Sequence, residues 1–412
     1  MSPRGLFFSL PLHGHVNPSL PLVRELVRRG DDITYVGTDA FAADIAATGA
    51  RFAAYRNAYL AGMSSEPLRT EELVWRLMQT TGDVLAVELD DARRLAPDYV
   101  VTDSVAPWGI WIGLLLGVPI ACSVSTFAFN RAFLRWAVAG GSRPQGVRGA
   151  ATEIWSFCRA FARTSRLRRR YGIRGPGLMA TMMGRSAGLN LVYTSPAFQP
   201  RAETFDRRYV FIGPSMEERR ATETPALPSS ARPLVYVSLG TLFNRDASFF
   251  RRCAQAFADR DVDVLISIGS HVEPVSLGPL PANVVVRPFV PQIDVLRRAS
   301  VFVSHAGMNS VSESLYLGVP LLLIPQMSEQ AMVARRVQEL GAGLVLRPED
   351  ASIEQLRSGV DRLLGESTFR SAAQAIGASL RACGGVRAGA DAVQAFTRAV
   401  RGGVDSGGTR SS

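Results

Sequence analysis

The plainest structural pattern in this chain lies in residues 301–320, which read Val301-Phe302-Val303-Ser304-His305-Ala306-Gly307-Met308-Asn309-Ser310-Val311-Ser312-Glu313-Ser314-Leu315-Tyr316-Leu317-Gly318-Val319-Pro320. The β-branched and aromatic residues at its start predict a buried parallel strand, which the small polar residues from Ser304 onward end. Asn309 or Ser310 can cap a helix, and Gly318 stops that helix after about two turns. The stretch therefore predicts a strand, a turn and a helix whose N-terminus points out of a sheet.

The turn in this stretch is suited to bind an anion. Free backbone N–H groups and the positive end of the helix dipole attract a phosphate, and Gly307 lets it approach the backbone closely. His305 could donate to that phosphate, and Glu313, on the first exposed turn, could accept hydrogen bonds from a sugar diol. The alternative is an ordinary strand-to-helix turn with a histidine and a glutamate on its surface.

Length and composition favour two domains. At 412 residues, of which 47% are hydrophobic, the chain can bury two cores of ordinary size. Its formal charge is +10, every basic residue is arginine, and the excess lies in residues 104–202, where Glu153 is the single acid. The densest arginine cluster, between Arg159 and Arg174, favours a solvated helix face, with contact to a membrane surface as the weaker alternative. No helix-turn-helix, RNP or zinc-finger pattern accompanies it, so we expect no nucleic-acid partner.

The cysteines and apolar runs favour a cytoplasmic protein without stable membrane insertion. The four cysteines, at positions 122, 158, 253 and 383, form no C-x-x-C pair, which argues against a disulfide framework or a zinc site. Residues 6–12 are apolar, but His13 and Asn17 stand where an export signal needs small residues. Residues 104–130 carry no charge, yet their prolines and glycines predict a buried helix, a Gly-Val-Pro turn and a strand rather than a membrane span.

The chain opens with a strand, helix and second strand. Residues 5–10 predict the first strand, Asn17 and Pro18 the start of the helix, and Gly30 its end. His15 then lies just before a helix N-terminus, at the edge where open α/β sheets place their chemistry. The helix dipole favours the neutral imidazole, which can accept a proton. The alternative is a turn histidine bonded to the backbone, which is the role expected for its neighbour at position 13.

Asp103 is the first carboxylate at the end of the apolar strand predicted at residues 98–102. In that position it could orient a histidine through the ring N–H and stabilise the imidazolium. Capping the next helix is an alternative that does not exclude this role.

Aromatic residues and methionines gather in the middle of the chain. Phe127, Phe129 and Met183 belong to a set that could form an adaptable apolar wall for an irregular hydrophobic ligand. Ordinary core packing would explain the same residues. Segments 55–80 and 126–185 have the weakest patterns, so the sequence does not identify that ligand.

The second half repeats the strand-and-turn pattern. Residues 234–238 predict a strand, after which Gly240 permits close backbone approach and Thr241 offers a hydroxyl to a phosphate. Side chains suited to a base or to sugar hydroxyls stand on two later loops. These are Phe289, Gln292, Glu329 and Gln330.

The two halves also match each other. Asp103 and His305 are each followed by a helix and a Gly-Val-Pro turn at nearly the same interval. We therefore predict an α/β fold of two Rossmann-like domains that face each other across an inter-domain cleft. The expected parts are an acceptor-binding domain at 1–214, a linker at 215–233, a nucleotide-sugar-binding domain at 234–385, a C-terminal helix at 386–401 that packs back towards the first domain, and a disordered tail at 402–412.

Taken together, these motifs resemble those of a known family. They are Gly14-His15-Val16-Asn17-Pro18, Asp103, Val237-Ser238-Leu239-Gly240-Thr241, Phe289-Val290-Pro291-Gln292, His305-Ala306-Gly307-Met308-Asn309-Ser310 and Glu329-Gln330. In these residues the chain resembles the inverting nucleotide-sugar glycosyltransferases of the GT-B fold, family one, and within it the macrolide-type bacterial enzymes that glycosylate natural products. The motifs run through nearly the whole chain, and the C-terminal run is highly specific.

The resemblance implies a role for each matching residue. His15 would be the general base that removes the proton of an acceptor hydroxyl, and Asp103 would hold and balance the charged imidazole. The hydroxyl would attack the anomeric carbon from behind and invert it. The donor contacts would be Thr241, His305, Asn309 and Ser310 on the diphosphate, Glu313 on the ribose, Gln292 and the Phe289 loop on the base, and Glu329 with Gln330 on the sugar. No metal or other cofactor is expected, only a UDP- or dTDP-sugar as co-substrate.

One departure from the family pattern concerns recognition of the nucleotide base: relatives often have Trp where this chain has Phe289. Donors that carry thymine therefore stay among the expected donors, alongside those that carry uracil. The expected reaction moves a hexose, glucose in the first instance, to a hydroxyl of a macrolide, polyketide or aromatic acceptor, in a monomer or homodimer. Two alternatives remain. A nucleotide-sugar epimerase of the same fold would turn over donor without an acceptor, and a non-catalytic sugar-nucleotide-binding helper would bind UDP without forming product.

Overall fold

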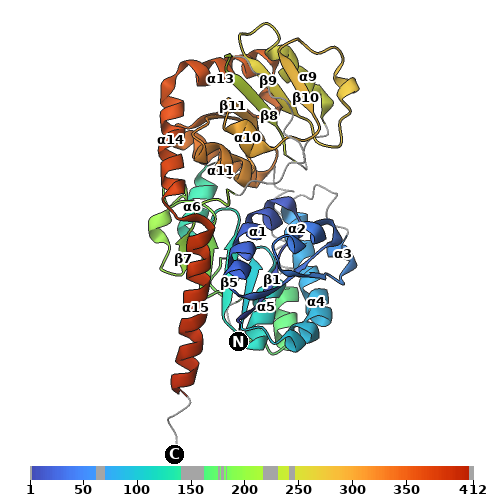
Figure 1. Cartoon of the computed structure of the whole chain (residues 1–412), viewed down its shortest axis with the longest axis vertical. Coiled ribbons are helices and arrows are strands. Elements are labelled where there is room, and N and C mark those ends of the chain that lie inside the picture. The colour runs from blue at the N-terminus through green and yellow to red at the C-terminus, as the bar shows by residue number, and fades with distance from the viewer. Residues whose placement is uncertain are drawn as a thin grey trace, which may run out of the picture. The chain divides into compact units, whose positions relative to one another are not determined.

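The computed structural model describes residues 2–61, 70–140, 162–174, 177, 181, 183–216, 231–240 and 246–407. The chain divides into two compact units, one of residues 1–215 with 383–412 and one of residues 216–382. Each unit is built on a parallel β-sheet with helices packed on it, as Figure 1 shows. The fold class predicted from the sequence, α/β with two Rossmann-like domains, is confirmed. Most of the predicted linker lies outside the described residues.

Among the described residues, the first unit has a seven-stranded parallel sheet in the order β3-β2-β1-β4-β5-β6-β7. The order runs outward from β1 in one direction and from β4 in the other, so the topological switch point lies between these two strands. The strands are β1 (Arg4–Phe8), β2 (Asp32–Gly37), β3 (Arg51–Ala54), β4 (Tyr99–Asp103), β5 (Ile120–Val124), β6 (Leu189–Val192) and β7 (Tyr209–Phe211).

Helices cover both faces of this sheet. The core on one face joins Phe7 of β1 to α1 (His13–Arg28) and α15 (Gly385–Gly407). The core on the other joins Leu6 and Phe8 to α4 (Thr70–Leu95) and α5 (Pro107–Leu116). Successive side chains of a strand point to opposite faces, which is why strands buried on both sides are apolar throughout. Shorter elements of the unit are η1 (Asp39–Phe41), α2 (Ala42–Ala46), α3 (Ala58–Ala61), α6 (Arg131–Ala139) and η3 (Ala202–Thr204).

Helix α1 begins earlier than the sequence predicted. Its N-cap is Leu12, whose carbonyl accepts the N–H groups of His15 and Val16 at 2.9 Å, so Asn17 does not cap the helix. Pro18 and Pro21 both lie inside the helix, although each lacks the N–H that an interior helical residue donates. His15 is therefore in the first turn of α1 rather than before it.

Helix α15 is longer than predicted. It continues to Gly407, past Arg401, where the sequence placed its end and the start of a disordered tail. Extending a helix that is already formed is easier than starting one, because each added residue gains a hydrogen bond. Its contacts within the first unit include ion pairs of Asp391 with Arg29 and of Arg401 with Asp98.

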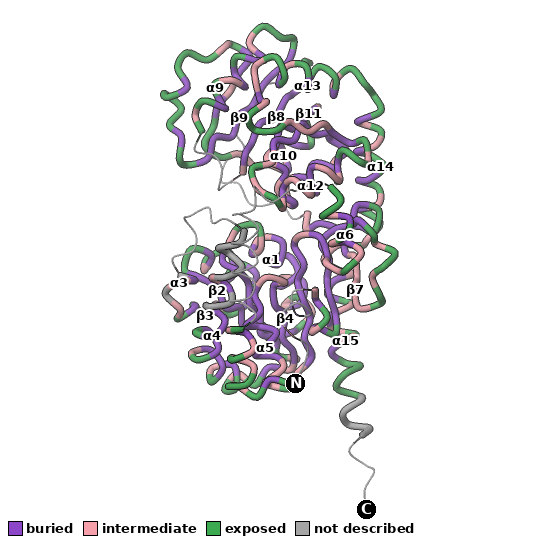
Figure 2. Tube along the Cα trace, turned by 180° about the vertical axis from the view of Figure 1, so that it is seen from behind, coloured by how far each residue is buried: buried purple, intermediate pink, exposed green. Residues whose placement is uncertain are grey.

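Among the described residues, the second unit has a six-stranded parallel sheet in the order β10-β9-β8-β11-β12-β13, with its switch point between β8 and β11. Figure 2 shows the strands of the sheets largely in the colour of buried residues. The strands are β8 (Leu234–Ser238), β9 (Asp263–Ser267), β10 (Val284–Arg287), β11 (Ala299–Ser304), β12 (Leu321–Leu323) and β13 (Gly343–Val345). The helices are α9 (Ala247–Ala256), α10 (Gln292–Leu296), α11 (Met308–Tyr316), α12 (Ser328–Glu339), α13 (Ile353–Gly365) and α14 (Ser367–Arg381), with short turns η4 (Pro274–Leu277) and η5 (Pro348–Asp350).

The strand, turn and helix predicted for residues 301–320 are confirmed as β11 and α11. Gly318 has φ +74°, as expected for a residue that ends a helix. The helix begins at Met308 with Gly307 as its N-cap, so neither Asn309 nor Ser310 caps it. Ala306 is left-handed, with φ +66°. This backbone turn directs the chain into the helix at Met308, before the positions at which a capping side chain was predicted.

The uncharged segment at residues 104–130 forms α5 and β5 with a left-handed Gly117 between them, as predicted. No helix in the part of the chain that the structure describes is long and apolar enough to cross a membrane.

Candidate active site

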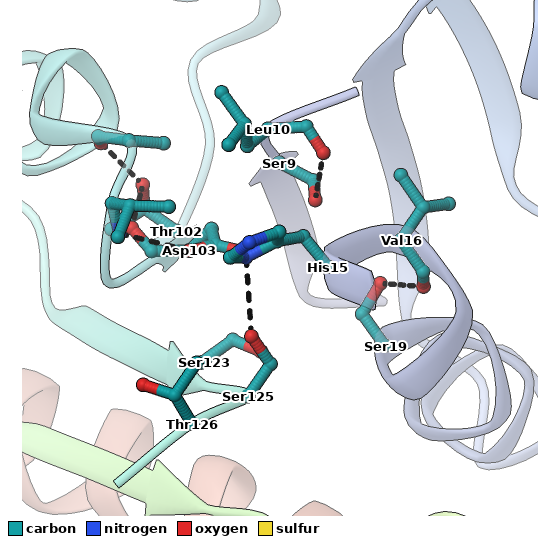
Figure 3. Close-up of polar contacts among 12 residues, drawn as sticks. Ser9, Leu10, His15, Val16, Ser19, Thr102, Asp103, Ser123, Ser125 and Thr126 are labelled. Atoms are coloured by element: carbon teal, nitrogen blue, oxygen red, sulfur yellow. Dashed lines mark hydrogen bonds and ion pairs between the residues drawn. The ribbon is translucent and has the colours of Figure 1, made fainter. Parts of the chain in front are cut away.

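His15 and Asp103 meet at the switch point of the first sheet, as Figure 3 shows. His15 Nδ1 lies 2.8 Å from Asp103 Oδ2. His15 is in the helix that follows β1, and Asp103 ends β4, the strand that pairs with β1. Neighbouring parallel strands end at the same edge of a sheet, which brings together two residues 88 positions apart.

The carboxylate of Asp103 determines which nitrogen of His15 can take a proton. Asp103 is 2% exposed, and its Oδ1 accepts the N–H of Val105 at 2.9 Å. An ionised carboxylate only accepts hydrogen bonds, so His15 Nδ1–H donates to Oδ2 and the lone pair is on Nε2. In this tautomer His15 can accept a proton at Nε2 while Asp103 stabilises the imidazolium.

The other titratable groups near Asp103 stay neutral. Burial raises the pKa of Tyr35 to about 12, and the charge on Asp103 adds to this. Burial also raises the pKa values of Tyr55, Tyr193 and Cys122, again with a contribution from Asp103. These four groups therefore add no charge of their own beside Asp103 at neutral pH.

Sequence reasoning missed Ser125. Its Oγ lies 3.1 Å from His15 Nδ1, drawn as a dashed line in Figure 3. Ser125 follows β5, which pairs with β4, just as Asp103 ends β4. A polar residue directly after the next apolar strand was a usable signal in the sequence. Ser123 and Thr126, on either side of Ser125, also carry hydroxyls, so the sequence did not show which of the three contacts His15.

The predicted acceptor wall divides into core and partly exposed residues. Phe127 is 2% exposed, and its ring centroid lies 5.7 Å from that of Phe133 and 5.5 Å from that of Phe198. Phe127 therefore belongs to the core, because a ring enclosed by other rings presents no surface to a ligand. Phe129 packs edge-on against Phe133 and is partly exposed. Met183 is also partly exposed, and its carbonyl accepts the Tyr209 hydroxyl.

In the second unit, His305 lies between two glycines. A Cβ at Gly240 would stand 2.6 Å from His305 Cε1, and a Cβ at Gly307 would stand 2.5 Å from Nε2. Gly240 also has φ +72°, a backbone conformation that favours glycine. Burial lowers the pKa of His305 to about 4, although a hydrogen bond with the Ser238 backbone acts in the opposite direction. The ring is therefore neutral at pH 7, and its buried Nδ1 has no hydrogen-bond partner among the described residues.

The chain turns in the same way after β8 and after β11. Ser238 Oγ accepts the N–H of Gly240 at 3.3 Å, and Ser304 Oγ accepts the N–H of Ala306 at 3.3 Å. Gly240 and Ala306 are both left-handed. Backbone N–H groups in such turns, beside the N-terminus of α11, form a concavity suited to an anion. Asn309 is in the first turn of α11, and Thr241 lies outside the described residues.

Gln292, Ser310 and Glu313 form one network. Gln292 Nε2 donates to Glu313 Oε2 at 2.6 Å and to Ser310 Oγ at 3.3 Å. Glu313 is 5% exposed and lies deeper in α11 than the first exposed turn on which the sequence placed it, because the helix begins at Met308. The ring of Phe289, by contrast, is 63% exposed on the loop before α10.

Glu329 and Gln330 lie in the first turn of α12 rather than on the loop before it. Gln330 is buried, and its Oε1 accepts the backbone N–H of Gln326 at 2.8 Å. Its carbonyl oxygen therefore holds the loop, and its Nε2 is the part that can donate to a ligand. Glu329 is partly exposed.

Two further features of the described residues concern ligands. No three His, Cys, Asp or Glu side chains among them gather closely enough to hold a metal ion. A cavity of about 350 Å³ lies in the first unit between α4 and strands β1 to β3, and its walls include Phe8, Val36 and Glu88. The residues that line it do not include His15, Asp103 or the predicted acceptor wall.

Comparisons with known proteins cover both units. Residues 251–383 match the family described as "Erythromycin biosynthesis protein CIII-like, C-terminal domain". The chain is 32% identical over 405 residues to an NDP-glycosyltransferase of Bacillus licheniformis, with 94% of this chain and 96% of that protein covered. It is 34% identical to the demethyllactenocin mycarosyltransferase of Streptomyces fradiae, over 94% of this chain and 85% of that enzyme. The crystal structure of a calicheamicin glycosyltransferase, 32% identical, superposes with a TM-score of 0.81 over 97% of this chain and 99% of that one.

Proposed function

The chain belongs to the macrolide-type, natural-product glycosyltransferases of the inverting GT-B family, which transfer a sugar from a nucleotide sugar, and on that premise we propose that His15 is its general base. The observation that carries the proposal is the 2.8 Å contact between His15 Nδ1 and the buried Asp103 carboxylate. It is supported by the position of the pair at the carboxyl end of the strands, where α/β sheets place their active sites.

The proposed reaction joins an acceptor oxygen to the anomeric carbon of the donor sugar. As that bond forms, the bond from the anomeric carbon to the diphosphate breaks on the opposite side, and the configuration inverts. The acceptor proton moves to His15 Nε2, and Asp103 stabilises the resulting imidazolium. The negative charge that leaves with the diphosphate is stabilised by hydrogen-bond donors and a helix N-terminus.

We propose that the donor binds at the switch point of the second sheet. The N-terminus of α11, Gly307 and the His305 ring would hold the diphosphate together with Thr241, Asn309 and Ser310. Glu313 would accept from the ribose, and the exposed Phe289 would stack on the base beside Gln292. Glu329 and the Nε2 group of Gln330 would contact a hydroxylated hexose, which favours glucose carried by UDP or dTDP. No further cofactor is proposed.

For the acceptor we propose a hydroxyl of a hydrophobic macrolide, polyketide or aromatic compound. Phe129 and Met183 are the partly exposed apolar residues of the predicted wall. An apolar wall with few polar groups suits a ligand whose body is held by burial of its surface.

The base is tested with His15→Ala, and His13→Ala, from the same helical turn, serves as its control. We expect His15→Ala to lower kcat by about 10²- to 10⁴-fold, the contribution of a general base. Its affinity for UDP, measured by calorimetry, should stay within about twofold of the wild type because no donor contact is removed. His13→Ala should retain both properties. Full transfer by His15→Ala would refute the assignment.

The substrates are tested by a mass-spectrometric screen of UDP-glucose and dTDP-sugars against a panel of hydrophobic aglycones. A glycosylated product identifies the donor and the acceptor together. Turnover of donor without any aglycone would instead indicate an epimerase, and UDP binding without any product would indicate a non-catalytic helper.

A further inference from the structure

We propose that Ser125 is a positioning residue for His15. The His15 Nδ1 proton is shared between the Asp103 carboxylate and the Ser125 hydroxyl oxygen, and the second hydrogen bond holds the imidazole and stabilises its charged form. This inference rests on the proposed role of His15 as the general base.

The geometry at Nδ1 supports a shared proton. Asp103 Oδ2 lies 2.8 Å and Ser125 Oγ 3.1 Å from the same nitrogen, and Nδ1 carries at most one hydrogen. If Ser125 donated to Nδ1 instead, the nitrogen would present a lone pair to the carboxylate oxygen, which is repulsive. The carboxylate therefore makes Ser125 an acceptor at this nitrogen, with Nε2 left to take the proton of the substrate.

Ser125 is held in place by buried side chains rather than by a surface loop. It is 3% exposed. Three residues further on, the buried Gln199 holds the loop, because its Oε1 accepts the Ala128 N–H at 2.9 Å and its Nε2 donates to the Ala128 carbonyl at 3.1 Å. Asn130 then caps α6 and donates to Thr204 Oγ1 at 2.7 Å. These contacts hold the backbone that follows Ser125.

Two oxygens, one from Asp103 at the end of β4 and one from Ser125 just after β5, limit rotation of the imidazole. Removing one of them leaves the ring bound to Asp103 but freer to turn, which lowers the fraction of molecules with Nε2 directed at the acceptor. It also removes an acceptor from the imidazolium and so makes protonation of His15 less favourable. The loss belongs to the chemical step and not to the binding of donor or acceptor.

The ionisable groups around His15 include one carboxylate and four buried side chains. Asp103 from β4 is a charged group in contact with His15. Tyr35, Tyr55, Tyr193 and Cys122 interact electrostatically with the carboxylate, and all four stay neutral between about pH 5 and pH 9 because burial raises their pKa values. If the acidic limb of the kcat/KM profile shifts between about pH 5 and pH 9, these four groups therefore do not cause the shift, and we attribute it to His15.

The test compares Ser125→Ala with Ser123→Ala, which also removes one buried hydroxyl from this segment but one that contacts Tyr193. For Ser125→Ala we expect kcat to fall about fivefold, the worth of one ordinary hydrogen bond, with KM unchanged. The acidic limb of kcat/KM should move to lower pH. Ser123→Ala should change neither property, and Ser125→Thr, which keeps the hydroxyl, should restore most of the rate.

A second measurement does not depend on turnover. The chain has four histidines, so the ring nitrogens of His15 can be assigned by ¹⁵N NMR through the loss of its signals in His15→Ala. Ser125→Ala should shift the His15 Nδ1 resonance and lower its titration midpoint, and Ser123→Ala should leave both unchanged.

Three results would overturn the proposal. These are a wild-type pH profile for Ser125→Ala, an equal loss in Ser123→Ala, and an unchanged His15 spectrum. Failure of the general-base assignment is a separate outcome, since it would appear as activity in His15→Ala while the spectrum still reported the Ser125 contact.

Discussion

His15 and His305 each lie beyond the carboxyl end of a central strand of their own sheet, His15 in the helix after β1 and His305 directly after β11, but their surroundings suit opposite tasks. His15 contacts a buried carboxylate, which stabilises a positive charge on the ring. His305 lies between Gly240 and Gly307, and burial lowers its pKa to about 4. A histidine with a carboxylate can take up a proton, whereas a buried histidine without one can only donate as a neutral ring.

The low pKa of His305 predicts that its contribution to nucleotide binding is independent of pH. His305→Ala should weaken UDP binding by about tenfold, and the ratio to wild type should be equal at about pH 5.5, 7 and 8. His271→Ala, an exposed histidine of the same unit, is the control. Calorimetry at the three pH values decides the matter, and a ratio that grows as pH falls through 6.5 would mean that a charged His305 binds the diphosphate.

At the scale of elements, α1 carries His15 and is joined to α15 by charged groups. Glu25 of α1 binds Arg28 and Arg29, and Arg29 also pairs with Asp391 of α15 at 2.5 Å. The hydrogen bond from Arg28, with further contributions from Arg29 and against the effect of burial, lowers the pKa of Glu25 to about 2. This carboxylate therefore helps to hold the helix that positions the base.

The depressed pKa of Glu25 predicts an acid-dependent loss of stability. The stabilisation is fully present above the unfolded pKa of 4.5 and is lost as pH falls towards about 2, because the folded protein resists protonation that the unfolded chain accepts. We expect Glu25→Gln to lower the free energy of unfolding by about 1 kcal/mol at neutral pH, since both arginines reach solvent. The difference should shrink below about pH 4. Urea unfolding of both proteins across this range measures it, and a constant difference would contradict the assignment.

At the scale of the whole molecule, two parallel-sheet units each place polar residues at their own switch point. The first holds His15, Asp103 and Ser125, and the second holds His305 and the Gln292 network. Separate apolar cores support the two sheets. A relative that matches over 94% of the chain indicates that both units belong to one enzyme.

This division predicts where a nucleotide protects the backbone. In hydrogen–deuterium exchange, UDP should slow exchange at residues 289–292 and 304–313, where ordered contacts reduce local opening. His305→Ala should reduce this protection. Protection confined to the ends of β1 and β4 would instead place the nucleotide in the first unit.

Strand and turn positions were predictable because their signals are local. Residues 234–238 were predicted as a strand to the residue, since an apolar run bounded by polar turns needs no distant partner. β3 escaped prediction because it is a short edge strand whose exposed residues break the apolar run. The starts of α1 and α11 were misplaced because backbone turns, and not capping side chains, begin these helices.

The sequence alone specified the fold class, the family resemblance and the residues His15, Asp103 and His305, all of which depend on local pattern. Only the tertiary structure decided that Ser125, 110 positions from His15, shares its Nδ1, that Phe127 is core, and that Glu313 is buried against Gln292. The physical reason is that these contacts follow from the order of strands in a sheet. That order is set by packing between distant segments, and no local pattern encodes it.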